Sequence, residues 1–273
     1  MRRSPESNET LHLWGSDCYD DAVRLFLAVL VGCSQPSQPA PGPVPAPSAP
    51  APAAVPDAPV VPDAPPVAPD AAAVARPPIV DTPMAWSDRR EALTLEYRRR
   101  HSDPDAVDLA IVPKVIVLHY TGGDSAKSTR SYFDNVTIED ARKELQRAGK
   151  VNVSAHFVVD RDGTIYQLQP VTRFARHCIG LNHVAIGIEN AGDEAKFPLT
   201  DAQVLADAAL VRWLVAENPT ITHLLGHHEV MGFRADPLYV ERDASYKNDK
   251  PDPGARFMAK VRAKLGDLDL KGP

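Results

Sequence analysis

The sequence predicts an α/β fold, a single domain in which helices flank a central mixed β-sheet. Within residues 84–273, short apolar runs rich in β-branched side chains alternate with segments of helical length, and one pair of runs is separated by an Asp-Gly turn. Strands that alternate with helices in this way are typical of α/β domains. A folded part of this length is sufficient to bury one hydrophobic core.

The strands are predicted from continuous or paired apolar runs. Residues 111–118 form an apolar run with β-branched residues, in which Lys114 is the one charged position, and this run predicts a buried strand. Residues 155–160 and 164–169 lie on either side of Arg161-Asp162-Gly163, a pattern typical of a β-hairpin. Further strands are predicted at 184–189 and 221–225.

The helices are predicted from caps and apolar spacing. Residues 137–140 resemble a capping box that opens a helix extending to about Gly149. Thr200 and Asp201 begin a helix that extends to about Glu217. A final amphipathic helix is expected over residues 254–265. The apolar positions of these last two helices are Val204, Ala208, Val211 and Val215, and then Phe257, Val261 and Leu265.

The residues before this domain differ sharply in composition. Residues 34–78 contain 16 prolines, and proline both fixes φ and removes a backbone donor, so neither helix nor sheet can propagate. Such a segment is a semi-rigid spacer with a reach of at most roughly 140 Å. We therefore divide the chain into a signal region at 1–33, a disordered tether at 34–83 and a catalytic domain at 84–273.

The signal region contains an apolar stretch, 23–32, followed by Cys33. The sequence Leu30-Val31-Gly32-Cys33 resembles the lipobox of bacterial lipoproteins, which implies a lipid on Cys33 and a membrane-anchored chain facing the periplasm. Ser34 in place of Asp favours the outer membrane. Residues 1–22 are acidic, unlike a signal sequence, which suggests a true start near Val23. The alternative is a short buried segment with an ordinary thiol.

Composition also restricts the classes of partner. The net charge is −6, and nothing suggests the basic face that nucleic-acid binding requires. No run of 18 apolar residues is present, so no ordinary transmembrane helix is expected. Cys178 would be alone in the processed domain, and no particular protein partner is indicated.

Three polar positions next to predicted strands or helices suggest a metal site. His119 ends the run at 111–118, His227 follows the strand at 221–225, and Asp252 lies just before the last helix. Two imidazoles and a carboxylate can bind a catalytic Zn²⁺ and leave a fourth position open. Such an ion lowers the pKa of bound water and polarises a carbonyl. Intervals of 108 and 25 residues are not a compact metal motif.

Five motifs occur in order: His119-Tyr120-Thr121; residues 153–157 before 160–163; residues 186–189; Gly226-His227; and Lys250-Pro251-Asp252-Pro253-Gly254. Together they resemble the amidase type 2 family, which includes bacterial anhydro-muropeptide amidases, phage lysozyme-type amidases and animal peptidoglycan recognition proteins. The likeness covers about Ile111 to Leu265 and extends, through the lipobox, to lipoprotein members of that family.

The resemblance implies a function and a set of roles. The zinc ligands would be His119, His227 (rather than the adjacent His228) and Asp252, in a groove at the sheet edge. Glu189 would act as the acid/base residue. Lys250 would lie near the developing oxyanion, although it could also be a solvated loop charge. The reaction would be hydrolysis of the amide between N-acetylmuramic acid and L-alanine in peptidoglycan or muropeptides.

Some positions around this set remain open. His156 either lines the groove or is structural, and His177 either contacts substrate or is structural. Relatives often have Trp and Ala where this chain has Arg176 and Cys178, which affects substrate preference. The loop at 229–249 borders the groove and is expected to shape stem-peptide recognition.

Two other functions are compatible with this family pattern. Some peptidoglycan recognition proteins keep the fold as non-catalytic binding modules, but the presence of Asp252 favours catalysis. A zinc peptidase that cuts within stem peptides would be distinguished by its products.

Overall fold

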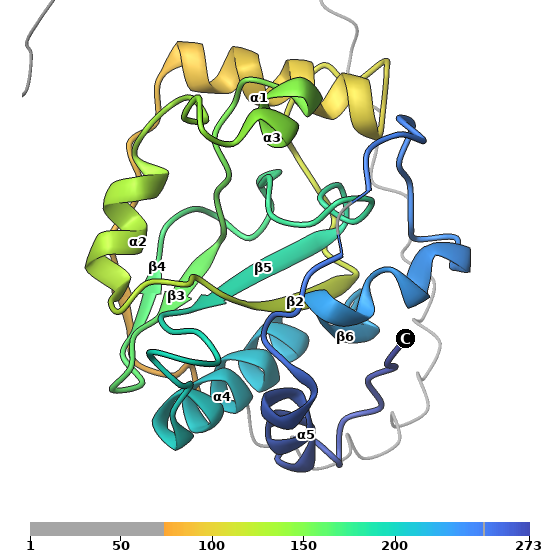
Figure 1. Ribbon diagram of the computed structural model, residues 1–273. Helices are drawn as coiled ribbons and strands as arrows, with labels where there is room; N and C mark the ends of the chain where they lie inside the picture. Colours follow the sequence, from red (N-terminus) through yellow and green to blue (C-terminus); the bar gives the residue numbers. More distant parts are fainter. Residues whose placement is uncertain (1–73, 248) are drawn as a thin grey trace, which may run out of the picture. The chain divides into compact units, whose positions relative to one another are not determined.

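A six-stranded mixed sheet lies at the centre of the computed structural model, which describes residues 74–247 and 249–273. The strand order is β1-β4-β3-β5-β2-β6 (Figure 1). β3 and β4 run antiparallel, and the other neighbouring pairs run parallel. The predicted α/β class with a mixed sheet is thus confirmed. The strands are β1 Ile79–Asp81, β2 Val115–Tyr120, β3 Phe157–Val159, β4 Ile165–Gln167, β5 Ala185–Asn190 and β6 His223–Gly226.

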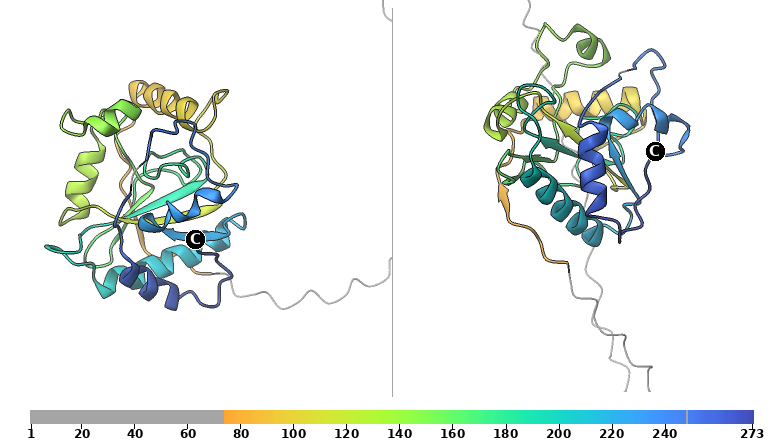
Figure 2. Two further views of the ribbon diagram at one scale, coloured as in Figure 1. Left: turned by 45° about the vertical axis from the view of Figure 1, so that its right-hand side comes forward. Right: turned by 60° about the horizontal axis from the view of Figure 1, so that its bottom comes forward.

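Helices lie on both sides of this sheet (Figures 1 and 2). The helices α4 and α5 pack against each other and cover one face, whereas α2 packs on β3 from the other side. The helices are α1 Asp88–His101, α2 Ala126–Phe133, α3 Lys143–Ala148, α4 Asp201–Glu217 and α5 Ala255–Ala263, with 3-10 turns at His227–Glu229 and Gly232–Ala235.

Side-chain alternation along β2 decides which face carries the polar residues. Ile116 and Leu118 belong to the core under α4 and α5, and Val115 and Val117 belong to a second core on the opposite face. Because the strand period is two, His119 falls on the face of Val115 and Val117. β5 is in register with β2, so His119 is paired with Glu189, which lies on that same face.

Several predicted elements are confirmed. β2, β5 and β6 overlap the predicted apolar runs, and β3 and β4 form the expected hairpin around residues 161–163. The helix α4 begins after Thr200, whose side chain and that of Gln203 form a capping box. The final helix is also present as α5.

Other elements differ from the prediction. α3 begins at Lys143 rather than near residue 137, because Thr137 instead forms a β-bridge with Val151. The helices α1 and α2 were not predicted. The short strand β1 pairs with β4, so the sheet begins before residue 84. Cys33, the signal region and the tether up to residue 73 lie outside the described residues.

Across the part of the chain that the structure describes, no helix has the length and apolar character needed to cross a bilayer.

Candidate metal centre and active site

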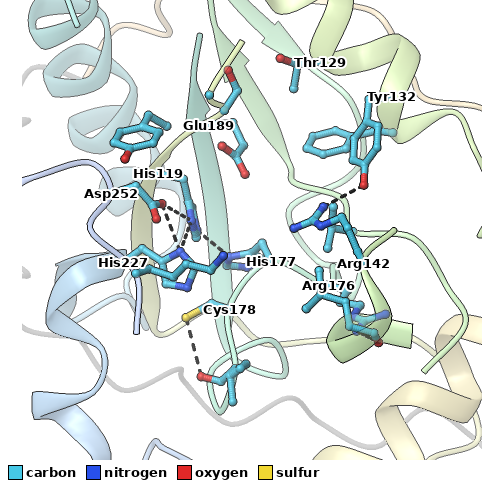
Figure 3. Close-up of a pocket in the computed structure, with 18 of the residues that line it drawn as sticks. His119, Thr129, Tyr132, Arg142, Arg176, His177, Cys178, Glu189, His227 and Asp252 are labelled. Carbon is cyan, nitrogen blue, oxygen red and sulfur yellow. Dashed lines mark hydrogen bonds and ion pairs between the residues drawn. The ribbon is translucent and has the colours of Figure 1, made fainter. Parts of the chain in front are cut away.

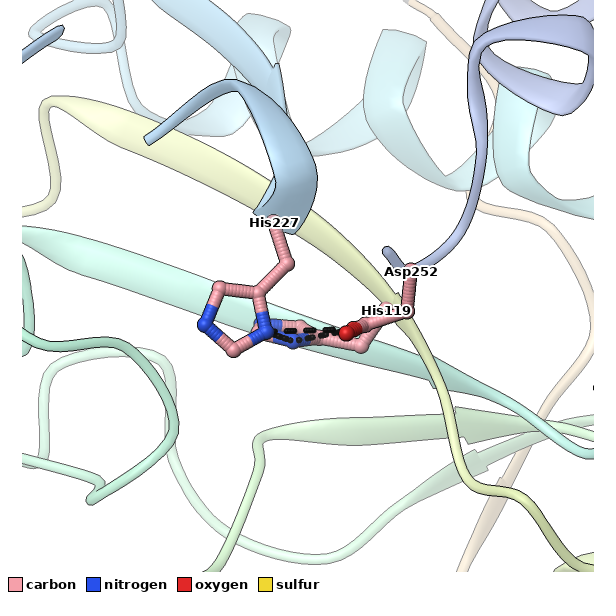
Figure 4. A group of neighbouring side chains, drawn as sticks. All are labelled: His119, His227 and Asp252. Carbon is pink, nitrogen blue, oxygen red and sulfur yellow. Dashed lines mark hydrogen bonds and ion pairs between the residues drawn. The ribbon is translucent and has the colours of Figure 1, made fainter. Parts of the chain in front are cut away.

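Three side chains converge beyond the carboxyl ends of β2 and β6 (Figure 4). His119 is the fifth residue of β2, His227 follows β6 directly, and Asp252 lies in the loop before α5. The Nδ1 atoms of the two histidines are 3.0 Å apart. Oδ2 of Asp252 lies 3.2 Å from Nδ1 of His119 and 3.1 Å from Nδ1 of His227. The structure therefore brings together three predicted ligands that are far apart in sequence.

The donor set fits a metal ion such as zinc. Zn–N distances of about 2.0–2.1 Å separate tetrahedral ligand atoms by about 3.3 Å, close to the sides of this triangle. The contact between the two ring nitrogens is a hydrogen bond only if one of them is protonated, and Asp252 requires that proton as well. A cation bound by three lone pairs satisfies all three atoms at once. His119, His227 and Asp252 could thus hold a metal ion.

Burial also favours the protonation states that bind a metal. The His119 side chain is almost fully buried, and desolvation, followed by the charge of His227, lowers its pKa to about 4. His119 is therefore neutral at neutral pH. Burial alone would raise the pKa of Asp252, but its contacts with the His119 and His227 imidazoles outweigh burial and hold that pKa below its usual range. Asp252 is therefore a carboxylate.

Backbone and side-chain contacts fix the turn that carries His227. Glu229 accepts a hydrogen bond from the Gly226 backbone amide at 2.7 Å and pairs with Arg262 of α5 at 2.6 Å. The backbone amide of His228 donates to the Asp252 carbonyl at 2.7 Å. His228 thus holds the Asp252 loop, and its ring lies outside the triangle, with Nδ1 3.2 Å from that same carbonyl oxygen.

Glu189 faces the triangle from the neighbouring strand (Figure 3). One of its carboxyl oxygens is buried and has no hydrogen-bond partner among the described residues. Burial, and then the negative charge of Asp252, raise the pKa of Glu189 well above its usual range, against the positive charges of Lys250 and Arg142. The carboxyl group therefore binds a proton more readily than that of an exposed glutamate.

These residues line a cavity of about 610 Å³. Lys250 also lines it, and its positive charge acts on both Glu189 and His119. The opposite wall is formed by residues of α1, α2, α3 and the loop before Lys250, and Figure 3 labels Tyr132, Arg142 and Arg176 on it. The residues of that wall include Tyr97, Tyr132, Arg142, Leu145, Arg176 and Tyr246.

The region that contains all of these metal-site residues matches a known family. The model of the N-acetylmuramoyl-L-alanine amidase family matches residues 110–255. The chain belongs to this amidase family. The membership that the five sequence motifs indicated is confirmed.

Individual members of the amidase family show similarity over parts of their length. The endolysin of Escherichia phage T7 is 32% identical over 101 residues, which is 35% of this chain and 66% of the endolysin. The 1,6-anhydro-N-acetylmuramyl-L-alanine amidase AmpD of Salmonella typhimurium is 28% identical over 158 residues, 53% of this chain and 76% of AmpD. Among solved structures, the amidase LysCS from Clostridium intestinale has 23% identity and a TM-score of 0.46, covering 72% of this chain and 99% of LysCS.

Of two further histidines near the amidase metal site, His177 lines the cavity and His156 does not. Nδ1 of His156 accepts from the Gly187 backbone amide at 3.0 Å, and its Nε2 lies 2.8 Å from the Arg173 carbonyl. His156 is fully buried, links β5 to the segment at 173 and is not among the residues that line the cavity. His177 instead contacts His119, with 3.0 Å between His177 Nδ1 and His119 Nε2.

Arg176 forms a part of the groove that the sequence did not predict. Its guanidinium donates to the carbonyls of Leu145, Gly149 and Val151 at 2.6–2.9 Å and lies 4.4 Å from the ring centre of Tyr97. These contacts join segments far apart in the sequence. One sign in the sequence marked this position as different: Arg176 stands where relatives often have Trp.

Proposed function

We propose that this chain is a zinc-dependent N-acetylmuramoyl-L-alanine amidase that cuts the amide between N-acetylmuramic acid and L-alanine in peptidoglycan or muropeptides. The observation that carries the proposal is the triangle of His119, His227 and Asp252 facing Glu189 in one pocket, within the region that matches the amidase family. The names of the T7 endolysin and AmpD relatives support it.

The zinc ion would be held by His119, His227 and Asp252. When bound there, zinc lowers the pKa of a neighbouring water and polarises the scissile carbonyl. The three residues supply two neutral imidazoles and one carboxylate, which leaves one tetrahedral position open.

Glu189 is placed to move the protons of this hydrolysis. As a carboxylate it accepts a proton from the attacking water while the C–O bond forms. It then donates that proton to the amide nitrogen as the C–N bond breaks, so that L-alanine leaves as a neutral amine. The pKa of Glu189 is raised by burial, which favours the second step. Lys250 lies two residues before Asp252. Its positive charge would stabilise the developing oxyanion.

We further propose, from the sequence, that Cys33 carries a lipid that anchors the chain to the outer membrane on its periplasmic side. The lipobox and the proline-rich tether support this proposal. Replacing Cys33→Ser should move the protein from the membrane fraction to the soluble periplasmic fraction, and retention in the membrane would contradict it.

The test of the amidase function is incubation of the full chain with purified peptidoglycan fragments, with and without a chelator, followed by mass spectrometry. We expect free peptides that begin with L-alanine and peptide-free glycans, lost with chelator and restored by Zn²⁺. Shortened peptides still attached to sugar would instead show a peptidase. Binding of the fragments without cleavage would show a recognition module.

A further inference from the structure

We propose that His177 is a positioning residue that fixes the tautomer and orientation of His119, so that His119 presents the lone pair of Nδ1 to a metal ion. This inference rests on the metal site of the proposed function. It gives His177, which lies beside His119 in the pocket lining (Figure 3), the role of supporting a metal ligand.

The directions of the hydrogen bonds in the series His119, His177 and Ala185 follow from the carbonyl at its end. Nε2 of His177 lies 3.3 Å from the Ala185 carbonyl oxygen, which can only accept, so this nitrogen carries the ring proton. A neutral imidazole has one N–H, so Nδ1 of His177 is an acceptor. The Nε2 of His119, 3.0 Å away, must then donate to it. His119 is left with an unprotonated Nδ1 that faces His227 and Asp252.

This arrangement extends a rule of metal sites. A histidine ligand usually donates its second N–H to a carboxylate, a carbonyl or water, which fixes the ring and its tautomer. Here the partner of His119 is a second imidazole, which is itself oriented by a main-chain carbonyl of β5. The two rings meet edge to face, with centroids 5.1 Å apart and planes at 87°.

Gly187 of β5 leaves space for the His177 ring. A Cβ added to Gly187 would lie 2.7 Å from both Cγ and Nδ1 of His177, far below ordinary contact. Gly187 lies two residues before Glu189 on the same face of the strand. The glycine therefore allows the His177 ring to lie directly on the sheet, where it forms part of the pocket lining.

The backbone of His177 is fixed as well. The side-chain oxygen of Asn182 accepts from the backbone amides of His177 and Cys178 at 2.8 and 2.7 Å. With its backbone held by Asn182 and both ring nitrogens engaged by His119 and Ala185, His177 has no polar ring atom left for a substrate within the described structure.

The decisive test compares two variants of the full chain in a zinc competition assay with a chromophoric chelator. In His177→Phe the volume is retained, but the hydrogen-bond acceptor for His119 is lost. In His177→Gln, an amide oxygen can accept from His119 and an amide nitrogen can donate to Ala185. We expect zinc affinity to fall roughly 10–100-fold in His177→Phe and to be largely retained in His177→Gln. Unchanged affinity in a folded His177→Phe protein would overturn the proposal.

A second variant displaces the ring without removing it. We expect Gly187→Ala to weaken zinc binding as His177→Phe does, with folding checked by circular dichroism. His183→Phe, a histidine outside the pocket lining, is the matched control and should bind zinc like the unmodified chain. Equal affinity of Gly187→Ala and the unmodified chain would count against the role of the ring's position.

The tautomer itself can be read without metal and without activity. ¹⁵N NMR of the metal-free chain should show His119 protonated at Nε2, and His177→Phe should lose this preference. If the unmodified chain shows this tautomer but binds no zinc, the proposed function fails and the positioning role stands. If it binds zinc and shows no such preference, the positioning role fails alone.

Discussion

The two walls of the pocket are built by different means. On the metal wall, His119 and Glu189 are neighbours because β2 and β5 pair in register, and His227 directly follows the adjacent strand β6. On the opposite wall, segments of α1, α3 and the loop before Lys250 are joined mainly by side chains, chiefly Arg176. The backbone therefore fixes the groups that react, whereas a few side chains fix the surface that meets the rest of the substrate.

A buried contact between His101 and Glu241 lies behind the opposite wall. Nδ1 of His101, at the end of α1, lies 2.8 Å from a carboxyl oxygen of Glu241, and its Nε2 lies 2.6 Å from the Ala148 carbonyl. This contact ties the loop at 229–249, whose contacts were not predictable, to α1 and α3. We expect changes on this wall to alter stability and substrate binding, and changes on the metal wall to alter the chemical step.

The largest effect is expected on the metal wall from Glu189→Gln. The amide cannot accept and return a proton, so kcat should fall roughly 10²–10⁴-fold. The zinc content should not change, because Glu189 is not part of the donor triangle. Steady-state kinetics with a muropeptide, together with metal analysis, measure both quantities. Glu217→Gln at the exposed end of α4 is the control, and a loss of less than tenfold in Glu189→Gln would assign the proton transfer elsewhere.

On the opposite wall, Arg176→Met should destabilise the fold. It removes hydrogen bonds to three carbonyls, and unsatisfied buried groups cost about 1–3 kcal/mol each. We expect the free energy of unfolding in urea to fall by about 3 kcal/mol, and KM to rise more than kcat falls. Arg173→Met removes a neighbouring arginine that stacks on Trp86 and should have a smaller effect on KM. Equal effects of the two variants would show that the loss does not depend on the contacts of Arg176.

The two walls also differ in how far the sequence predicted them. Apolar runs and the Thr200 cap predicted β2, β5, β6 and α4, since burial and capping leave local patterns. The positions of His119 and His227 next to predicted strands suggested a metal site. Their assignment with Asp252 as one set depended on the family motifs, because a spacing of 108 residues contains no geometric information.

The opposite wall left little local signal. α1 buries Arg90, Thr94, Tyr97 and His101, so it has no apolar stripe that would reveal a helix. Arg176 and the loop at 229–249 take part through contacts between distant segments, and pairings of this kind follow from the tertiary fold alone. The predicted start of α3 near residue 137 was wrong for a similar reason, since the bridge between Thr137 and Val151 is a tertiary contact.

The metal wall is supported from behind by a buried carboxyl group, which gives a pH-dependent prediction. Asp207 of α4 accepts a hydrogen bond from the Asn190 side chain at 2.9 Å, and the same amide lies 3.3 Å from the His119 carbonyl. Burial raises the pKa of Asp207 to about 7, although the hydrogen bond from Asn190 opposes it. An unfolded Asp has a pKa of about 3.9.

Because the folded pKa is the higher one, the folded state binds more protons between about pH 4 and 7. The free energy of unfolding should therefore fall as pH rises through this window. Asp207→Asn lacks this pH-dependent loss. The free energy of unfolding of the variant minus that of the unmodified chain should therefore rise by about 2–3 kcal/mol from pH 5 to pH 8. Urea unfolding at several pH values measures this difference. Asp201→Asn, exposed at the start of the same helix, should show no such gain, and a pH-independent difference for Asp207→Asn would contradict a protonated Asp207.

The smallest effect is expected from Tyr246, the aromatic residue that the loop at 229–249 adds to the pocket lining. Its ring lies 5.1 Å from that of His101, and its hydroxyl accepts a 3.3 Å hydrogen bond from Arg176. Tyr246→Ala removes this part of the surface, so KM for a muropeptide should rise roughly 3–10-fold with kcat nearly unchanged, the pattern of lost uniform binding. Tyr246→Phe keeps the ring and loses only the long hydrogen bond, so its KM should stay close to that of the unmodified chain. If kcat fell in Tyr246→Ala while KM held, the loop would act on the chemical step, and the division of the pocket into a reacting wall and a binding wall would not hold at this residue.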